Sequence, residues 1–365
     1  MTKDVDNKVE FSNRLHRYKQ LIDEDIETFA VEQQKSTLSN YGPQASTPVE
    51  VYLHILRRGG KRLRGALTMF GYEMCGGTDK TMIIQAARAV EMIHAYLLIM
   101  DDIQDRSLLR RGEKTAHIAL AAIHEEKGYK GDSSHFGVAL ALNAMGIGNH
   151  QAHLVISNLP VSDALRLHAM RLLDETVVLT AHGQTLDICN EMSGDVTIDD
   201  VKKVMEFKTA YYTILNPLQI GMALAGASDV QMDAVRAFTL YVGRAFQIKD
   251  DITGIFGTEK ELGKSPQDDI REGKQTILTV HVRTHAVTKE RDYLLQHLGN
   301  KALTQKQFEK CKEIITQSGS LAFAEELLHS ELASARSCIE TLNNHFKTAD
   351  LTFLRGLVDS LDTPS

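Results

Sequence analysis

The sequence predicts an all-α protein, and three observations carry that prediction. Apolar residues recur at spacings of three and four along most of the chain, for example at Met170, Leu173 and Val177, which is the period of an amphipathic helix. Sustained alternation of apolar and polar residues, the signal of a strand, is hard to find. The chain has only six prolines, and Pro48, Pro160 and Pro217 stand where helix boundaries are plausible.

The helical pattern resumes after every connection, so we expect one array of helices within a single domain covering residues 1–365. Residues 1–45 are expected to form an N-terminal extension or a first helix, and the polar stretch 36–48 a connection. The stretch 257–274 is long, charged and punctuated by glycine, which is typical of a functional loop. The expected helices span about 5–35, 46–58, 61–75, 80–105, 114–127, 133–158, 161–191, 198–226, 229–254, 274–287, 303–317, 319–344 and 348–361.

Composition narrows the classes of function. With 43% hydrophobic and 24% charged residues the chain has the composition of a globular protein. A formal charge of −7 argues against a general nucleic-acid binder. The four cysteines lie far apart without CxxC spacing, which fits a reducing compartment.

The N-terminal residues lack the apolar core of a signal peptide, and the apolar stretch 136–149 falls short of a membrane span. We therefore expect a cytoplasmic protein without a transmembrane segment.

Three carboxylates end an apolar run in YLLIMDDIQD, residues 96–105. Asp101 and Asp105 are four residues apart and Asp102 lies three before Asp105, so their carboxylates can converge beside a helix. Like charges repel one another, and an oxygen-only ligand set with room for water and phosphate suits Mg²⁺. An isolated DDxxD is more often a solvated acidic turn. Here the apolar residues before it favour acids at the mouth of a buried groove.

A second acid pair, Asp250 and Asp251, follows another largely apolar run in GRAFQIKDDITGIFG, residues 243–257. Two acid-ended helices facing each other across a bundle could hold several divalent ions. Lys249 beside the pair leaves open a surface charge cluster.

Basic residues form the complement of these acids. They occur in GGKRLRG at 59–65, in RRG at 110–112, and at Lys208, Lys264 and Lys274. Lys61 and Arg64 would lie near the start of a helix, whose free N–H groups also favour anions. A lone GGKR is more often a turn with solvated charges. Together these cations predict a diphosphate held between Mg²⁺ and basic side chains.

At this point the chain resembles the trans-isoprenyl diphosphate synthases of the farnesyl and geranylgeranyl type. The matching motifs are GGKRLRG, EMIHAYLLIMDDIQDRSLLRRG, GQTLD, KTA, FQIKDD and GKSPQDDIREGKQT, in that order over roughly residues 45–280. The resemblance implies an isoprenoid-synthase helical bundle around a central apolar cavity. It also implies a homodimeric prenyltransferase whose substrates are isopentenyl diphosphate and an allylic prenyl diphosphate.

The resemblance also implies the residues of the site. The expected ligands of three Mg²⁺ ions are Asp101, Asp102, Asp105, Asp250 and Asp251. The expected ligands of the isopentenyl diphosphate group are Gly60, Lys61, Arg64, His94 and Arg111, and those of the allylic diphosphate are Arg110, Lys208 and Lys264. The side chains expected beside the developing cation are Thr209, Gln247, Gln184 and Asp187, with Phe246 also binding substrate. Of all these, Lys208, Thr209, Gln247, Asp101, Asp105 and Asp250 are expected to be catalytic.

In such a mechanism the allylic C–O bond breaks because Mg²⁺ and cationic side chains stabilise the departing diphosphate. The double bond of isopentenyl diphosphate then attacks the carbocation, and a proton leaves. Water has to be excluded, so we hypothesise that the loop 257–274 closes over the site.

In the family, bulk at the fifth and fourth positions before the first aspartate limits product length. These positions hold Tyr96 and Leu97, and DDIQD has no insertion. This arrangement resembles archaeal geranylgeranyl synthases, so we expect a C20 product, with farnesyl or longer chains as the alternatives. One departure from the family is Gly254, which stands where many members carry a third aspartate of the second motif.

Other functions remain open at this stage. A class I terpene cyclase shares metal-assisted ionisation, but the second cation set around GGKRLRG, His94 and Arg111 argues against it. A catalytically silent regulatory subunit would be expected to have lost acids or cations that this chain keeps. A plain helical interaction protein is the simplest remaining alternative.

Overall fold

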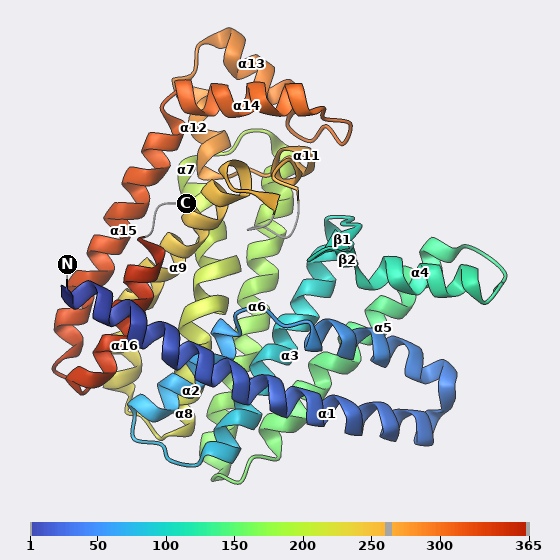
Figure 1. Cartoon of the computed structure of the whole chain (residues 1–365), viewed down its shortest axis with the longest axis vertical. Coiled ribbons are helices and arrows are strands. Elements are labelled where there is room, and N and C mark those ends of the chain that lie inside the picture. Colours follow the sequence, from blue (N-terminus) through green and yellow to red (C-terminus); the bar gives the residue numbers. More distant parts are fainter. Residues whose placement is uncertain (1, 260–264, 363–365) are drawn as a thin grey trace. The chain divides into compact units, whose positions relative to one another are not determined.

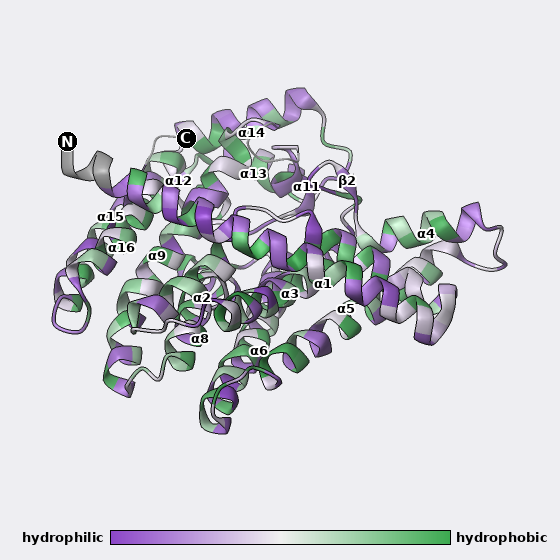
Figure 2. Ribbon diagram, turned by 60° about the horizontal axis from the view of Figure 1, so that its bottom comes forward, coloured by the Kyte–Doolittle hydropathy of each residue, from purple (hydrophilic) through white to green (hydrophobic). Residues whose placement is uncertain are grey.

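The computed structural model describes residues 2–259 and 265–362, and nearly all of them are helical (Figure 1), which confirms the all-α prediction. Figure 2 shows apolar residues recurring along the helices with hydrophilic ones between them. The elements are α1 Thr2–Arg57, α2 Leu63–Met74, α3 Lys80–Gln104, β1 Leu109–Arg110, β2 Glu113–Lys114, α4 Ala116–Glu126, α5 Ser133–Ser157, α6 Asp163–Ser193, α7 Ile198–Val204, η1 Met205–Leu215, α8 Asn216–Leu224, α9 Asp229–Phe256, α11 Asp268–Glu272, α12 Ile277–His285, α13 Thr288–His297, α14 Gln305–Gln317, α15 Ser320–Leu342 and α16 Thr348–Leu361.

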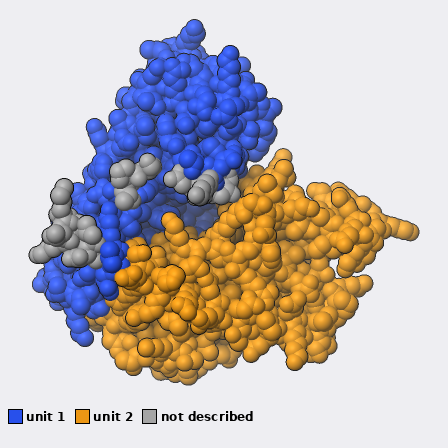
Figure 3. Space-filling model, viewed as in Figure 1, with its two compact units in different colours: residues 1–10, 178–215, 233–365 blue, residues 11–177, 216–232 orange. Residues whose placement is uncertain are grey.

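The chain forms two compact units that are interleaved along the sequence (Figure 3). Unit 2 comprises residues 11–177 and 216–232, and unit 1 comprises residues 1–10, 178–215 and 233–365. Helix α6 contributes its first half to unit 2 and its second half to unit 1. Neither unit is one continuous stretch, and the expectation of a single domain stays a prediction.

Helix α1 reverses at one residue. The expected connection at 36–48 is wrong, because this stretch stays helical except at Gly42, whose φ is 79°. Glycine adopts that conformation without steric penalty, and Pro43 directly after it suits the first turn of the next helix. Arg57 returns to pair with Glu27 at 2.9 Å. The single break therefore folds α1 back on itself, as Figure 1 shows.

Unit 2 is built around α3. The side chains of α3 are buried along most of its length, and it packs against α2 and α5. Helices α2 and α8 also approach closely, because a Cβ on Gly71 or Gly221 would overlap the backbone of the other helix. Among the described residues α3 is long and apolar enough to cross a membrane by length and composition, yet 67% of its most apolar window is buried. That is the environment of a core helix.

The expected helix 198–226 is in fact three segments, α7 and η1 in unit 1 and α8 in unit 2, because a π-helix, η1, replaces the α-helical ladder over Met205–Leu215. At 11 residues η1 is longer than the single-turn π segments that are frequent at functional sites. Helices α11 and α13 were not expected. The first has only five residues, and the second, TKERDYLLQH, has too few apolar residues to show a helical period.

Candidate active site

In unit 2 the acids of the first motif lie at the C-terminal end of α3. Asp105 is the C-cap residue. Arg110 donates to both preceding acids, at 2.7 Å to Asp102 and 3.0 Å to Asp101. Asp102 is 2% exposed. The predicted proximity of acids and arginine is confirmed, and one guanidinium bridges two carboxylates.

Arg110 and Arg111 stand on a β-hairpin that the sequence did not suggest. The expected helix 80–105 stops short of both arginines, and α3 ends at Gln104. Strands β1 and β2 pair in antiparallel fashion, and Arg111 and Gly112 at the turn have φ of 53° and 77°. Two consecutive positive φ values are typical of a tight hairpin turn. The turn brings Arg110 back to the acids and directs Arg111 toward Gly60.

Burial raises the pKa of Asp102 to about 6, because the carboxylate is removed from water. Arg110 opposes this rise, and the charges of Asp101 and Asp105 add to it. The guanidinium therefore does not fully compensate the buried acid. A divalent cation beside this carboxylate would favour its charged form further.

The cations of unit 2 surround His94. The pKa of His94 lies well below its usual value, first because burial removes the ring from water and then because neighbouring arginines repel a second positive charge. These neighbours are Arg64, Arg111, Arg110 and Arg62. A neutral imidazole among guanidinium groups offers an N–H donor to an anion. The structure thus brings together His94, Arg64 and Arg111 as predicted.

The first two glycines of GGKRLRG are places where arginines lie against the backbone. A Cβ on Gly59 would meet the guanidinium of Arg62 at 2.6 Å, and one on Gly60 would meet that of Arg111 at 2.8 Å. Lys61 is exposed and precedes α2, which begins at Leu63 and not at 61 as expected.

Arg62 is a site residue that the sequence did not reveal. Its φ is 52° and it is 4% exposed. Its side chain donates to Asp23 at 2.8 Å, to Glu91 at 3.3 Å and to the carbonyl of Leu56 at 2.7 Å. Glu91 in turn accepts from the backbone N–H of Gly65 at 2.8 Å, so this N–H at the start of α2 already has an acceptor. The buried network fixes the loop that carries Lys61 and Arg64.

In unit 1 a lysine–aspartate pair joins η1 to α6. Lys208 donates to Asp187 at 2.7 Å. A Cβ on Gly183 would overlap the backbone nitrogen of Lys208, so this glycine permits the close approach of the two helices. Gln184 is 3% exposed, and its amide nitrogen has no hydrogen-bond partner among the described residues.

A row of polar side chains runs from η1 to the second acid motif. Thr209 donates to Gln247 at 2.5 Å, and Gln247 donates to Asp251 at 2.8 Å. Burial raises the pKa of Asp251 well above its usual value; the Gln247 amide opposes this rise, and the charges of Asp250, Asp269 and Asp187 add to it. Thr209 and Gln247, both expected beside the developing cation, thus lie together within unit 1, and Gln247 also contacts Asp251 of the second acid motif.

Four further basic, acidic and aromatic residues were singled out in the sequence, and they lie on or after α9. Asp250 is exposed and Phe246 is half-buried, both on α9. Lys274 lies 3.5 Å from Glu272. Lys264 lies outside the described residues, so its role stays a prediction.

The donor set fits magnesium. The acids of both motifs offer oxygen ligands only, and Asp102 and Asp251 are buried among further carboxylates. Within residues 2–259 and 265–362 no three His, Cys, Asp or Glu side chains are already arranged to hold an ion by themselves. This is the usual situation for Mg²⁺, which takes one or two carboxylates and completes its shell with water and phosphate oxygens.

The two expected chain-length residues differ in surroundings. Leu97 is 5% exposed and lies one helical turn before Asp101, on the same face of α3. Tyr96 is half-buried, and its hydroxyl points to the sulfur of Met100 at 4.0 Å. Leu97 is therefore the one of the two that shares a face with the first acid.

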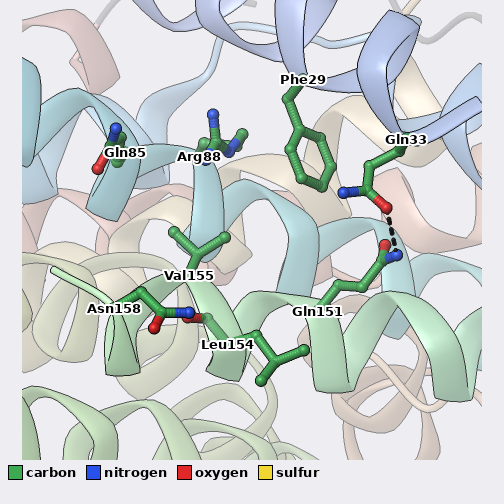
Figure 4. Close-up of a pocket in the computed structure, with 8 residues that line it drawn as sticks. All are labelled: Phe29, Gln33, Gln85, Arg88, Gln151, Leu154, Val155 and Asn158. Carbon is green, nitrogen blue, oxygen red and sulfur yellow. Dashed lines mark hydrogen bonds between the residues drawn. The ribbon is translucent and has the colours of Figure 1, made fainter. Parts of the chain in front are cut away.

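A hollow of about 450 Å³ in unit 2 lies away from these acids (Figure 4). It is lined from α1, α3 and α5, and Gln33 accepts from Gln151 across it at 2.8 Å. Arg88 at its wall is already paired with Asp25. It contains none of the predicted site residues.

The sequence model of the polyprenyl synthetase family matches residues 47–315. Geranylgeranyl diphosphate synthase of Saccharolobus solfataricus is 32% identical over 78% of this chain and 81% of its own length. Geranylfarnesyl diphosphate synthase of Aeropyrum pernix is 30% identical over 79% and 85%. The crystal structure of geranylgeranyl pyrophosphate synthase from Corynebacterium glutamicum, complexed with isoprenyl diphosphate and magnesium, matches with a TM-score of 0.89 at 27% identity, covering 95% of this chain and 98% of that one. The chain belongs to the polyprenyl synthetase family and is a prenyltransferase.

Proposed function

We propose that this protein condenses isopentenyl diphosphate head to tail with an allylic prenyl diphosphate and that its main product is geranylgeranyl diphosphate. The observation that carries the proposal is the cation set of unit 2. Arg64 and Arg111 are among the arginines around His94, and Arg110 pairs with the acids. We infer that His94, Arg64 and Arg111 bind one diphosphate, in addition to the diphosphate bound at the acids. A cyclase that ionises a single diphosphate has no use for a second anion site.

The diphosphate of isopentenyl diphosphate would be bound by side chains of unit 2, namely Lys61, Arg64, His94 and Arg111. Arginine can bind two phosphate oxygens at once, and lysine adds a point charge. His94, held neutral by its surroundings, would donate a hydrogen bond without adding to the positive charge. These groups orient the nucleophilic double bond, which is where most of their catalytic effect would arise.

The allylic diphosphate would be bound by Arg110 and Lys208. Three magnesium ions would be held by the acids of the two motifs, which are Asp101, Asp102 and Asp105 in unit 2 and Asp250 and Asp251 in unit 1. When bound, these ions would supply Lewis-acid stabilisation of the departing diphosphate. Arg110, which pairs with Asp101 and Asp102, would bind oxygens of the same diphosphate.

Thr209 and Gln247 would stabilise the carbocation. Their side-chain oxygens are neutral, so they can lie beside a cation without forming a bond to it. Gln247 is oriented from both sides, by Thr209 and by Asp251. Asp187 fixes Lys208 from α6, and Gln184 lies one turn earlier on that helix. After condensation, the proton would leave to an oxygen of the released diphosphate.

Product length should be set on α3. The relatives named for geranylgeranyl and geranylfarnesyl products support a C20 main product. Leu97 shares the face of Asp101, and Tyr96 lies beside it. Tyr96→Ala and Leu97→Ala should both lengthen the products, Leu97→Ala more. An unchanged distribution for either variant would remove that residue as a limit.

One assay tests the reaction itself. The purified protein is incubated with Mg²⁺, isopentenyl diphosphate and each of dimethylallyl, geranyl and farnesyl diphosphate, and the products are separated by length. We expect a C20 diphosphate that requires both substrates and disappears with EDTA. A cyclic hydrocarbon made without isopentenyl diphosphate would indicate a cyclase. No turnover with any of the three would contradict the proposed function.

We also propose a homodimer that acts in the cytoplasm. Ile147 and Leu154 are seven residues apart on one face of α5 and are 37% and 60% exposed, which supports a partner surface there. Cys75, Cys189, Cys311 and Cys338 are free thiols, as expected in a reducing compartment. Light scattering of Ile147→Asp/Leu154→Asp should give a monomer mass. A dimer mass for this variant would place the interface elsewhere.

A further inference from the structure

The second acid motif ends in glycine for a structural reason. Gly254 lies on α9 four residues after Asp250 and three after Asp251, so a side chain there would stand on the same face as the acid pair. The space in question is already filled. The carboxylate of Asp269 lies so close to Gly254 that a Cβ at this position would overlap its Oδ2 atom. No other residue type fits at 254 while Asp269 keeps this position.

Asp269 is held there by its own short element. It belongs to α11, whose Ile270 is fully buried. The carbonyl of Ile270 accepts from the N–H of Gly299 at 2.8 Å, and the carbonyl of Asp269 accepts from the N–H of Lys274 at 3.0 Å. Gly273 ends the helix with φ of 84°. Backbone bonds and a buried apolar anchor thus position a carboxylate that is 8% exposed.

The electrostatic surroundings match the geometry. Asp250, Asp269 and Asp187 are the acids whose charges act on Asp251, and Asp187 is already paired with Lys208. The neighbouring Asp268 is different, because it is more exposed and its carboxylate lies 3.7 Å from the guanidinium of Arg271 on the same helix. Only one of the two adjacent aspartates of α11 contributes to the acid group on α9.

We propose that Asp269 supplies the third carboxylate of the second acid motif, in the space that a side chain at position 254 would otherwise occupy, and that it binds diphosphate-bound magnesium directly or through a metal-bound water. Gly254 and Asp269 then form an exchangeable pair: an acid can come from α9 or from α11, but not from both in this arrangement. The role depends on the proposed function, because it requires magnesium and diphosphate in unit 1.

The test measures metal binding on the full-length protein, independently of turnover. Mn²⁺, which is visible by electron paramagnetic resonance, is titrated in the presence of inorganic pyrophosphate. Asp269→Asn, which keeps the side-chain shape, should weaken Mn²⁺ binding about tenfold, the usual effect of losing such a partner. Asp268→Asn is the matched control and should bind as the wild type does. Equal affinities for the two variants would overturn the proposal.

The exchange between positions 254 and 269 is tested by placing an aspartate at 254 and removing the one at 269. Gly254→Asp alone should weaken binding or lower the melting temperature, because its Cβ overlaps Asp269. Gly254→Asp/Asp269→Ala should bind Mn²⁺ within about threefold of the wild type, whereas Asp269→Ala alone should lose about tenfold. A double variant no better than Asp269→Ala would overturn the proposal. A wild type that neither binds Mn²⁺ with pyrophosphate nor forms prenyl product would instead overturn the proposed function, and this role with it.

Discussion

At the scale of single residues, the site is built from charges that are buried before any ligand is present. Asp102 shares Arg110 with Asp101, and Asp251 lies among other acids. Arg62 is buried and fully engaged. Arg62, Arg106 and Arg111 have positive φ, a conformation that costs a residue with a Cβ about 1 kcal/mol or more. The folded chain bears these costs at arginines that lie just before α2, just after α3 and at the turn between β1 and β2.

Arg62 should act through its neighbours and not on substrate. A lysine at this position keeps the charge but cannot bond Asp23, Glu91 and Leu56 together. We expect Arg62→Lys to raise the KM for isopentenyl diphosphate about tenfold, because Lys61 and Arg64 lose their support, with kcat and the allylic KM little changed. Steady-state kinetics with each substrate varied in turn measures this. Arg17→Lys, at a position 61% exposed, is the control, and unchanged KM values for Arg62→Lys would refute the positioning role.

Asp102 should make the metal-free protein less stable as pH rises. Its pKa is raised from 3.8 to about 6 in the folded state, so between these pH values the native protein binds a proton that the unfolded chain has released. Stability therefore falls across this window, by roughly 3 kcal/mol for this group. In urea unfolding with EDTA, Asp102→Asn should gain stability relative to wild type at pH 7 and not at pH 4. An equal difference in unfolding free energy between the variant and the wild type at the two pH values would contradict the raised pKa of Asp102.

At the scale of elements, close helix contacts place the side chains of unit 1. The π-helix η1 carries Lys208 and Thr209, and Gly183 lets α6 approach its backbone. Gly243 on α9 lies against Ala210 of η1 in the same manner. These glycines occur inside helices, where the residue costs about 1 kcal/mol relative to alanine. Their presence is explained by the contact and not by a turn.

Gly183→Ala should therefore separate α6 from η1. We expect a loss of about 1–3 kcal/mol in stability, the usual cost of overpacking, and a large fall in turnover because Lys208 is displaced from Asp187. Thermal unfolding and the condensation assay measure the two effects. Thr185→Ala, exposed on the same helix, should change stability by less than about 0.5 kcal/mol. A Gly183→Ala variant as active as Thr185→Ala would show that the close contact has no catalytic role.

At the scale of the whole molecule, ligands should stabilise the folded chain by mass action. We expect magnesium and pyrophosphate to bind the folded chain and not the unfolded one, so together at about 100 times their dissociation constant they should add roughly 2.7 kcal/mol to the free energy of unfolding. We expect the melting temperature to rise by several degrees with both ligands, less with either alone, and not at all with EDTA. Sodium chloride at matched ionic strength controls for screening. An equal rise with sodium chloride would mean that no specific site forms.

The sequence by itself determined the helical class, nearly all helix positions and the residues of each motif, because helical periodicity and spacings such as DDxxD are local properties of the chain. It did not reveal the reversal at Gly42, the hairpin under Arg110 and Arg111, the π-helix under Lys208, or the place of Arg62. Nor did it explain Gly254. The Gly42 reversal and the hairpin are local turns whose direction the helical period does not encode. The burial of Arg62 and the glycine at 254 depend on contacts between separate elements, as when Asp269 from α11 fills the space above Gly254 on α9. Only the tertiary structure decides such contacts, because steric exclusion between two elements leaves no period in either of them.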